Sequence, residues 1–169
     1  NRCYFCKSNV YETLVEFAAT KGIQTIIDGT NADDVGDHRP GRKAARERGV
    51  RSPLQEAALH KEEIRSYAHD LELPLWDKPA AACLASRIPY GSRVTVEKLS
   101  QVERAEATIR AIGVRQLRVR HHGDTARVEV DPTQFELLIQ HRDSIVAELL
   151  QLGFVHVSLD LAGFRSGSM

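Results

Sequence analysis

The sequence predicts an α/β protein in two parts, a partial parallel-sheet domain followed by a small α+β domain. Apolar residues at helical spacing over residues 10–21 precede a β-branched run over 23–27, which is the helix-to-strand order of a parallel α/β unit. Beyond Gly91 the pattern changes to helix, strand, strand, helix and strand. We therefore expect one domain over residues 1–91 and another over 92–169.

In the first part, residues 28–34 (DGTNADD) follow the expected strand as a polar turn. Open α/β sheets bind ligands at the carboxyl ends of their strands, so this turn is a candidate binding loop. Residues 35–51 read as a long functional loop, residues 52–54 as a short buried strand, and residues 60–71 as a helix. Two strands make an incomplete parallel sheet, so we expect the first βα units and their glycine-rich nucleotide loop to be missing from this sequence.

The second part is expected to form its own antiparallel sheet. Its predicted elements are a helix over 96–112, strands over 116–121 and 126–130, a helix over 133–152 and a strand over 155–161.

Composition is that of an ordinary globular protein, with 169 residues of which 42% are hydrophobic. No apolar run approaches the roughly 20 residues that span a bilayer. The 23 basic and 23 acidic side chains cancel, which argues against a general nucleic-acid binder. The chain starts without Met or a leader pattern, which indicates truncation, and its thiols favour a cytoplasmic location.

Three cysteines are the best clue to the chemistry: Cys3 and Cys6 in the segment NRCYFCK, and Cys83 in an alanine-rich stretch. A disulfide would leave one thiol over, and a tetrahedral zinc site would need a fourth ligand, such as a histidine. An iron–sulfur cluster held by three thiolates would leave one iron open for reaction. Ordinary buried or surface thiols are the bland alternative.

Charged residues supply the other candidates. The carboxylates of residues 28–34 form either a capping turn or a magnesium and nucleotide site. Arg118 and Arg120 alternate with apolar residues, so both point from one face of a strand, either as a phosphate site or paired with Glu129. The carboxylates that could be either solvated charges or ligands of a divalent metal are Glu106, Glu129 and Glu136.

Five segments together, in order and spacing, resemble the LarE family of ATP-dependent sulfur transferases, within the PP-loop ATP pyrophosphatase superfamily. They are residues 28–34, 37–41 (DHRPG), 87–91 (RIPYG), 118–120 (RVR) and 160–167 (DLAGFRSG). The resemblance runs nearly end to end, but the family's SGGxDS loop is absent. It implies a PP-loop fold for the first domain, a substrate-binding or oligomerisation role for the second, and a homo-oligomer.

The resemblance also implies a reaction. Family members adenylate a carboxylate of a pyridinium dicarboxylate mononucleotide with ATP and then insert sulfur, a step toward the nickel-pincer cofactor of lactate racemase. A mixed anhydride with AMP offers a leaving group that a free carboxylate lacks. Some members sacrifice one cysteine, whereas others use a 4Fe-4S cluster on three cysteines. This sequence looks like the second type, because Ala82 stands at the sacrificial position.

Residue roles follow by position. The resemblance assigns Cys3, Cys6 and Cys83 to the cluster; Lys7, Asp28, Gly29, Asn31, Asp34 and Arg39 to the nucleotide; Arg118, Arg120 and Arg165 to the substrate phosphate; and Glu106, Glu129 and Glu136 to a divalent cation. Two alternatives stay open, a PP-loop tRNA thiolase and a non-enzymatic zinc-stabilised module.

Overall fold

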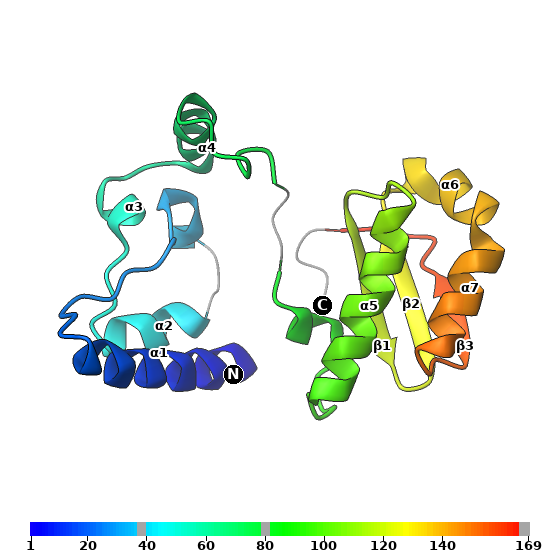
Figure 1. Ribbon diagram of the computed structural model, residues 1–169, viewed down its shortest axis with the longest axis horizontal. Coiled ribbons are helices and arrows are strands. Elements are labelled where there is room, and N and C mark those ends of the chain that lie inside the picture. The colour runs from blue at the N-terminus through cyan, green and yellow to red at the C-terminus, as the bar shows by residue number, and fades with distance from the viewer. Residues whose placement is uncertain (37–39, 79–81, 166–169) are drawn as a thin grey trace. The chain divides into compact units, whose positions relative to one another are not determined.

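The computed structural model describes residues 1–36, 40–78 and 82–165. The chain divides into two compact units, Asn1–Lys78 and Pro79–Met169 (Figure 1). The division between the units falls ahead of the boundary expected near Gly91. Both units contain helices; the first adds an isolated β-bridge and the second a three-stranded sheet, in agreement with the predicted α/β class. The PP-loop fold stays a prediction.

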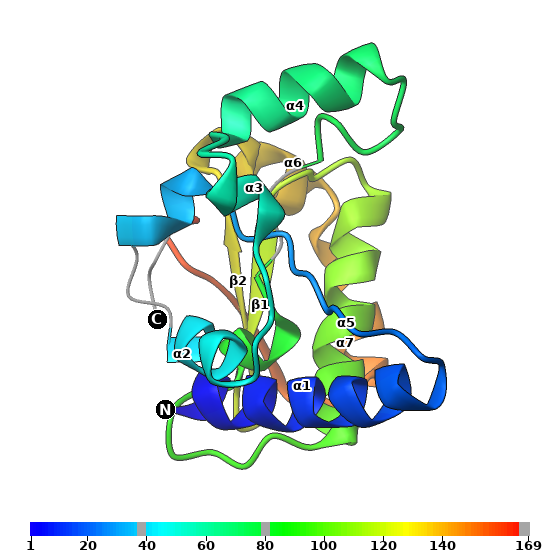
Figure 2. The same ribbon diagram turned by 90° about the vertical axis from the view of Figure 1, so that its left-hand side faces the viewer.

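Two helices form the base of the first unit. Helix α1 (Arg2–Thr20) and helix α2 (Pro40–Glu47) lie side by side (Figure 2). Their small core buries Tyr11 against Ala44 and Ala45, since alanines allow the two helix backbones to approach closely. The long loop expected over 35–51 is therefore wrong in its second half: Pro40 stands at the first helical position, where its fixed φ suits a helix start.

The expected strands of the first unit are reduced to one parallel bridge between Ile27 and Arg51. The strand predicted over 52–54 is wrong, because Ser52 and Pro53 instead begin the short helix α3 (Pro53–Glu56). Ile23 and Ile27, at 53% and 63% exposed, find no neighbouring strand among the described residues. The parallel-sheet pattern is thus present in sequence but barely paired.

The rest of the first unit consists of the 3-10 helix η1 (Ala32–Gly36) and helix α4 (Lys61–Asp70). The helix predicted over 60–71 is confirmed. His60 precedes it as N-cap, and the backbone N–H of His60 donates to the Glu63 carboxylate at 2.8 Å.

The second unit packs three helices on one face of a three-stranded sheet. Strands β1 (Leu117–His122), β2 (Thr125–Val130) and β3 (His156–Leu159) lie in that order, and the helices are α5 (Val96–Ala111), α6 (Phe135–Gln140) and α7 (Arg142–Gln151) (Figure 1). Two 3-10 helices, η2 (Leu84–Arg87) and η3 (Pro132–Gln134), complete the unit.

The core of this unit follows the side-chain periods of its elements. Ala105 and Ile109 of α5 are fully buried against Val119 of β1 and Val128 of β2. Alternate residues on each strand therefore face the helices, and the residues between them form the opposite face. Thr95 caps α5 by accepting from the Lys98 backbone N–H.

Two expectations for this unit need correction. The sheet is mixed: β1 and β2 are antiparallel, but β3 is parallel to β2, because the helical connection returns the chain to the same end of the sheet. The single helix predicted over 133–152 is broken at His141, although buried Leu138 and Ile145 on either side face the same core. No described helix combines the length and apolar character that crossing a membrane requires.

Candidate functional site

Asp28 is the best-held carboxylate of the first unit. It accepts hydrogen bonds from Ser52 Oγ at 2.7 Å, from the Thr30 backbone N–H at 3.1 Å and from the Tyr11 hydroxyl at 3.2 Å. Burial raises the pKa of Asp28, but these hydrogen bonds outweigh burial and leave the pKa below its ordinary value. Asp28 is therefore ionised near neutral pH and fixed at the start of the candidate binding loop.

The rest of that loop is ordered by its own polar side chains. The Asn31 backbone N–H donates to Asp34 Oδ2 at 3.2 Å, and the Asp33 backbone N–H donates to Asn31 Oδ1 at 3.1 Å. Asp33 in turn accepts from the Lys61 backbone N–H at 2.7 Å and contacts His60 Nδ1 at 2.6 Å. Of the neighbouring Asp33 and Asp34, it is thus Asp33 that binds the amino terminus of α4 through the Lys61 backbone N–H.

Lys7 lies close to this loop through Tyr11. Its Nζ is 5.8 Å from the centre of the Tyr11 ring, whose hydroxyl donates to Asp28. Gly41 of α2 leaves room for the Lys7 side chain, because a Cβ there would stand 2.5 Å from Lys7 Cδ. Lys7 and Asp28 therefore both contact Tyr11, which connects them. The sequence did not predict this role of Tyr11. Arg39, also assigned to the nucleotide, lies outside the described residues.

Cys3 and Cys6 share one face of α1. They stand three positions apart in the helix (i, i+3), a spacing that makes helix side chains neighbours. All three cysteines of the chain are free and exposed. Free, accessible thiols suit the ligation of a soft metal ion.

Cys83 stands at the head of a short segment that we call the Cys83 segment, residues 82–87. The segment contains η2, in which the Ser86 backbone N–H donates to the Cys83 carbonyl at 2.9 Å. Arg87 Nη1 donates to the Ala82 carbonyl at 3.0 Å and to Ser86 Oγ at 3.0 Å, and it lies 3.4 Å from the Cys83 carbonyl. The guanidinium group of Arg87 thus contacts Ala82, Cys83 and Ser86 of the segment.

Glu106 of α5 binds that same guanidinium group. Arg87 Nε and Nη2 donate to the two oxygens of Glu106 at 2.7 and 3.3 Å. Glu106 also accepts from Arg110 Nη2 at 2.6 Å and from the Val119 backbone N–H at 3.2 Å. Because β1 is an edge strand, Glu106 satisfies a backbone donor that no neighbouring strand reaches.

Glu129 plays the matching part on β2. Arg120 Nε and Nη2 donate to its two oxygens at 2.7 and 3.1 Å, and Arg127 Nη2 donates to Oε1 at 2.9 Å. Arg120 Nη1 also donates to the Ser86 carbonyl at 3.3 Å. Arg120 is therefore both paired with Glu129, the alternative that the sequence left open, and attached to the Cys83 segment.

Arg118 lies on the same sheet face, two residues before Arg120. Its Nη1 donates to the backbone carbonyl of Arg165 at 3.1 Å, and its guanidinium carbon lies 4.4 Å from the centre of the Phe164 ring. Burial lowers the pKa of Arg118, and the charges of Arg120 and Arg87 lower it further. Nearby cations that repel one another make this face receptive to an anion.

The three carboxylates assigned to a divalent cation accept hydrogen bonds from side chains of the protein. Glu106 and Glu129 are each 1% exposed, and their oxygens already accept from arginines. Glu136 is exposed on α6 and accepts from Gln140 Nε2 at 3.4 Å. Within the described parts of the chain, no three His, Cys, Asp or Glu side chains converge on a common metal position. A cation at Glu106 or Glu129 would have to displace arginines.

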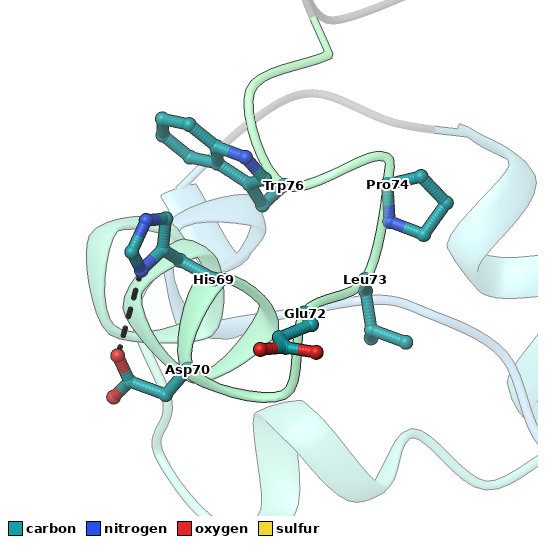
Figure 3. A pocket seen from close by; sticks show the side chains of 6 residues that line it. All are labelled: His69, Asp70, Glu72, Leu73, Pro74 and Trp76. Carbon is teal, nitrogen blue, oxygen red and sulfur yellow. Dashed lines mark ion pairs between the residues drawn. The ribbon is translucent and has the colours of Figure 1, made fainter.

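An open pocket in the first unit lies at the end of α4, apart from the residues of the candidate binding loop. It is lined by His69, Asp70, Glu72, Leu73, Pro74 and Trp76 (Figure 3). The His69 and Trp76 rings meet edge to face with centres 4.9 Å apart, and His69 Nδ1 lies 3.6 Å from Asp70 Oδ1. None of these side chains belongs to the predicted site.

The sequence placed Arg87 in a motif but predicted no role for it. It predicted no role for Arg110 or Arg127 either. Burial was the missing signal, because an arginine that is 4% exposed must be paired with a carboxylate. In sum, the second unit presents an exposed thiol on a segment bound to a sheet face that carries several arginines. Such an arrangement suits the class of proteins that bind an anionic ligand beside a thiol.

Comparison with known proteins agrees with that class. No family model matches the sequence. The chain is 49% identical over 173 residues to an uncharacterized protein of Synechocystis sp., covering 100% of the chain and 64% of that protein. It is 40% identical over 166 residues to the pyridinium-3,5-bisthiocarboxylic acid mononucleotide synthase of Lactiplantibacillus plantarum, covering 98% of the chain and 60% of the synthase.

A third relative, an uncharacterized protein of Methanocaldococcus jannaschii, is 28% identical over 165 residues, covering 98% of the chain and 64% of that protein. The chain therefore spans less than two thirds of the length of each of these relatives. The match to the synthase over 98% of the chain supports the resemblance to the LarE family that the sequence motifs indicate.

Proposed function

We propose that the protein is a sulfur transferase that inserts sulfur into an adenylated carboxylate of a pyridinium dicarboxylate mononucleotide. The observation that carries the proposal is the 40% identity to the Lactiplantibacillus plantarum synthase over 98% of the chain. The arginine-bearing sheet face beside the Cys83 segment supports it, because that substrate carries a phosphate and carboxylates.

The chain's residues would divide the work as follows. Lys7 and the loop around Asp28 bind ATP with Mg²⁺, and Arg118 and Arg165 bind the phosphate of the mononucleotide. ATP activates a substrate carboxylate as the mixed anhydride with AMP. A sulfur nucleophile then forms a bond to the carboxyl carbon, the C–O bond to AMP breaks, and AMP leaves with the bonding electron pair.

The sulfur source follows from the three thiols. We propose that Cys3, Cys6 and Cys83 hold a 4Fe-4S cluster with one iron left open. When bound, such a cluster supplies an extra sulfide for transfer. The thiols fit this role because all three are free and exposed. The proposal extends to a PP-loop fold for the first unit, a cytoplasmic location and a homo-oligomeric protein.

A direct assay tests the function. The full protein, reconstituted anaerobically with iron and sulfide, is incubated with ATP, Mg²⁺ and pyridinium dicarboxylate mononucleotide, and the product is analysed by mass spectrometry. We expect the mass change of an oxygen-to-sulfur exchange together with release of AMP. Thiolation of tRNA with no change in the mononucleotide would instead establish the thiolase alternative, which the synthase match does not favour.

A further inference from the structure

We propose that Arg87, held by Glu106, is a positioning residue that fixes the Cys83 segment against β1, and that Arg120, held by Glu129, provides a second attachment. The inference rests on the proposed role of Cys83 in sulfur transfer. The two arginines would keep the exposed Cys83 thiol in a defined position.

The Cys83 segment has little regular structure of its own. Its backbone hydrogen bonds include that from Ser86 N–H to the Cys83 carbonyl at 2.9 Å and that from Ile88 N–H to the Ala85 carbonyl at 3.2 Å. A four-residue 3-10 helix is too short to be stable by itself. The hydrogen bonds that tie it to the fold include those of Arg87 with Glu106 and that of Arg120 Nη1 with the Ser86 carbonyl. Arg87 Nη1 in turn donates to Ala82 and Ser86 within the segment.

Arg87 can serve this purpose because Glu106 divides its donors. The guanidinium group uses Nε and Nη2 for Glu106 and presents Nη1 to the segment. This division depends on the flat, forked shape of arginine, which lysine lacks. The charge of Arg87, at 4% exposed, is tolerable only with that carboxylate.

Glu106 is itself placed by the sheet. It accepts the Val119 backbone N–H of the edge strand at 3.2 Å, so its position follows β1. The order of contacts is therefore β1, Glu106, Arg87 and the Cys83 segment. Strand β1 also carries Arg118, which we assign to the substrate phosphate, so the same strand sets the places of the thiol and the anion.

The second attachment repeats this arrangement. Arg120 uses Nε and Nη2 for Glu129, at 2.7 and 3.1 Å, and presents Nη1 to the Ser86 carbonyl at 3.3 Å. Two buried carboxylates thus each hold one arginine that reaches the same segment. Pairing with arginines compensates the charge of both buried carboxylates.

The chain offers a matched control for each arginine. Arg110 also pairs with Glu106, and Arg127 also pairs with Glu129, each through Nη2 alone and at a more exposed position. Within the described parts of the chain, neither control residue forms a hydrogen bond or an ion pair with the Cys83 segment. Arg87→Lys and Arg110→Lys both keep a positive charge beside Glu106, but only Arg87→Lys removes donors to the segment.

The test is hydrogen–deuterium exchange of the full protein, read on peptides covering residues 82–90 and on peptides of β1 and β2. We expect Arg87→Lys to speed exchange over residues 83–88 by roughly tenfold while β1 and β2 stay protected, and Arg110→Lys to leave both unchanged. Arg120→Lys is expected to act like Arg87→Lys, and Arg127→Lys like Arg110→Lys. Equal exchange in the Arg87→Lys and Arg110→Lys proteins would overturn the proposal.

If Arg87→Lys prevents folding, hydrogen–deuterium exchange of the wild-type protein still tests the proposal. The Ser86 and Ile88 amides, which donate to the Cys83 and Ala85 carbonyls of the segment, are expected to be protected to the level of β1 amides. Exchange at the rate of a free loop would contradict the proposal. Exchange needs neither cluster nor substrate, so a protected segment without sulfur transfer would refute the proposed function and leave the positioning role standing.

Discussion

Arg87 and Glu106 are 19 residues apart in the sequence and form a forked ion pair of 2.7 and 3.3 Å in the core of the second unit. The carboxylate is 1% exposed and the arginine 4% exposed. Such a pair is costly to bury and more costly to break, since removing one partner leaves an uncompensated charge. Its position beside Cys83 connects the stability of the second unit to the proposed chemistry.

The first prediction concerns the substrate phosphate. Arg118→Ala should weaken binding of the mononucleotide at least about tenfold, because a charge-assisted hydrogen bond to phosphate is lost. Isothermal titration calorimetry measures the affinity. Arg104→Ala, which removes an exposed arginine of α5, is the matched control and should bind as the wild type does. Equal affinities in the two variants would remove Arg118 from the phosphate site.

The second prediction separates an arginine-holding carboxylate from a metal ligand. Glu129→Ala should lower the free energy of unfolding of the second unit by about 3–5 kcal/mol, because the buried Arg120 loses the carboxylate that accepts from its Nε and Nη2. Glu136→Ala, at an exposed position, should change it by less than about 0.5 kcal/mol. Hydrogen exchange of β1 and β2 amides across a urea series measures both.

The same series tests the divalent cation. We expect Mg²⁺ or Mn²⁺ to leave the urea midpoint of wild-type β1 and β2 unchanged, because the carboxylates already accept from arginines. A cation-dependent increase in the wild type that disappears in Glu129→Ala would instead support the divalent-cation assignment.

The third prediction is a loss of stability at acidic pH caused by His121. Burial lowers the pKa of His121, and the charge of Lys98 lowers it further. Gln101 Nε2 donates to the Leu152 carbonyl at 2.8 Å, so its Oε1 is left to accept from His121 Nε2–H at 3.1 Å. The imidazole is therefore neutral in the fold, and a second proton would place a charge beside the Phe154 ring.

The sign follows from this lowered pKa. The unfolded chain binds a proton at His121 below pH of about 6.5, whereas the folded chain binds it only at lower pH. The contribution of His121 to stability is thus fully present above pH of about 6.5 and is lost as the pH falls toward the folded pKa. His121→Gln should flatten the dependence of unfolding free energy on pH in that window. An unchanged slope would show that His121 is not its source.

The fourth prediction concerns Lys7 and the nucleotide. Gly41→Ala places a methyl group where Lys7 Cδ lies, and the flexible lysine can move aside, so folding should be retained. If Lys7 binds ATP from its present position, the affinity for a non-hydrolysable ATP analogue should fall several-fold. Gly36→Ala is the control, because nothing lies within 4 Å of its added Cβ. Equal affinities in the two variants would contradict the assignment of Lys7.

The second unit was largely predictable because its elements carry strong local patterns. Apolar residues of α5 recur at helical spacing, and β1 alternates apolar and charged residues, so their types and approximate bounds follow from periodicity. The break at His141 has no glycine or proline to mark it. The parallel pairing of β3 depends on where the helices return the chain, which is a property of the packed fold.

The first unit was less predictable because its β-branched run lacks pairing partners. Ile23 and Ile27 carry the preference for strand, but a strand forms only where a neighbour exists, and the structure shows one bridge to Arg51. At the candidate site, the pairing of Arg120 with Glu129 was one of the alternatives that the sequence offered, whereas the pairing of Arg87 with Glu106 became evident only from the fold. Whether a glutamate accepts from arginine or binds a metal depends on three-dimensional neighbours.

The most direct test of the account is the iron content of the anaerobically reconstituted protein. The three-thiol proposal predicts about four irons per chain with broad visible absorption in the wild type, and loss of both in Cys3→Ala, Cys6→Ala and Cys83→Ala. An intact cluster in any one of these variants, or zinc alone in the wild type, would contradict it.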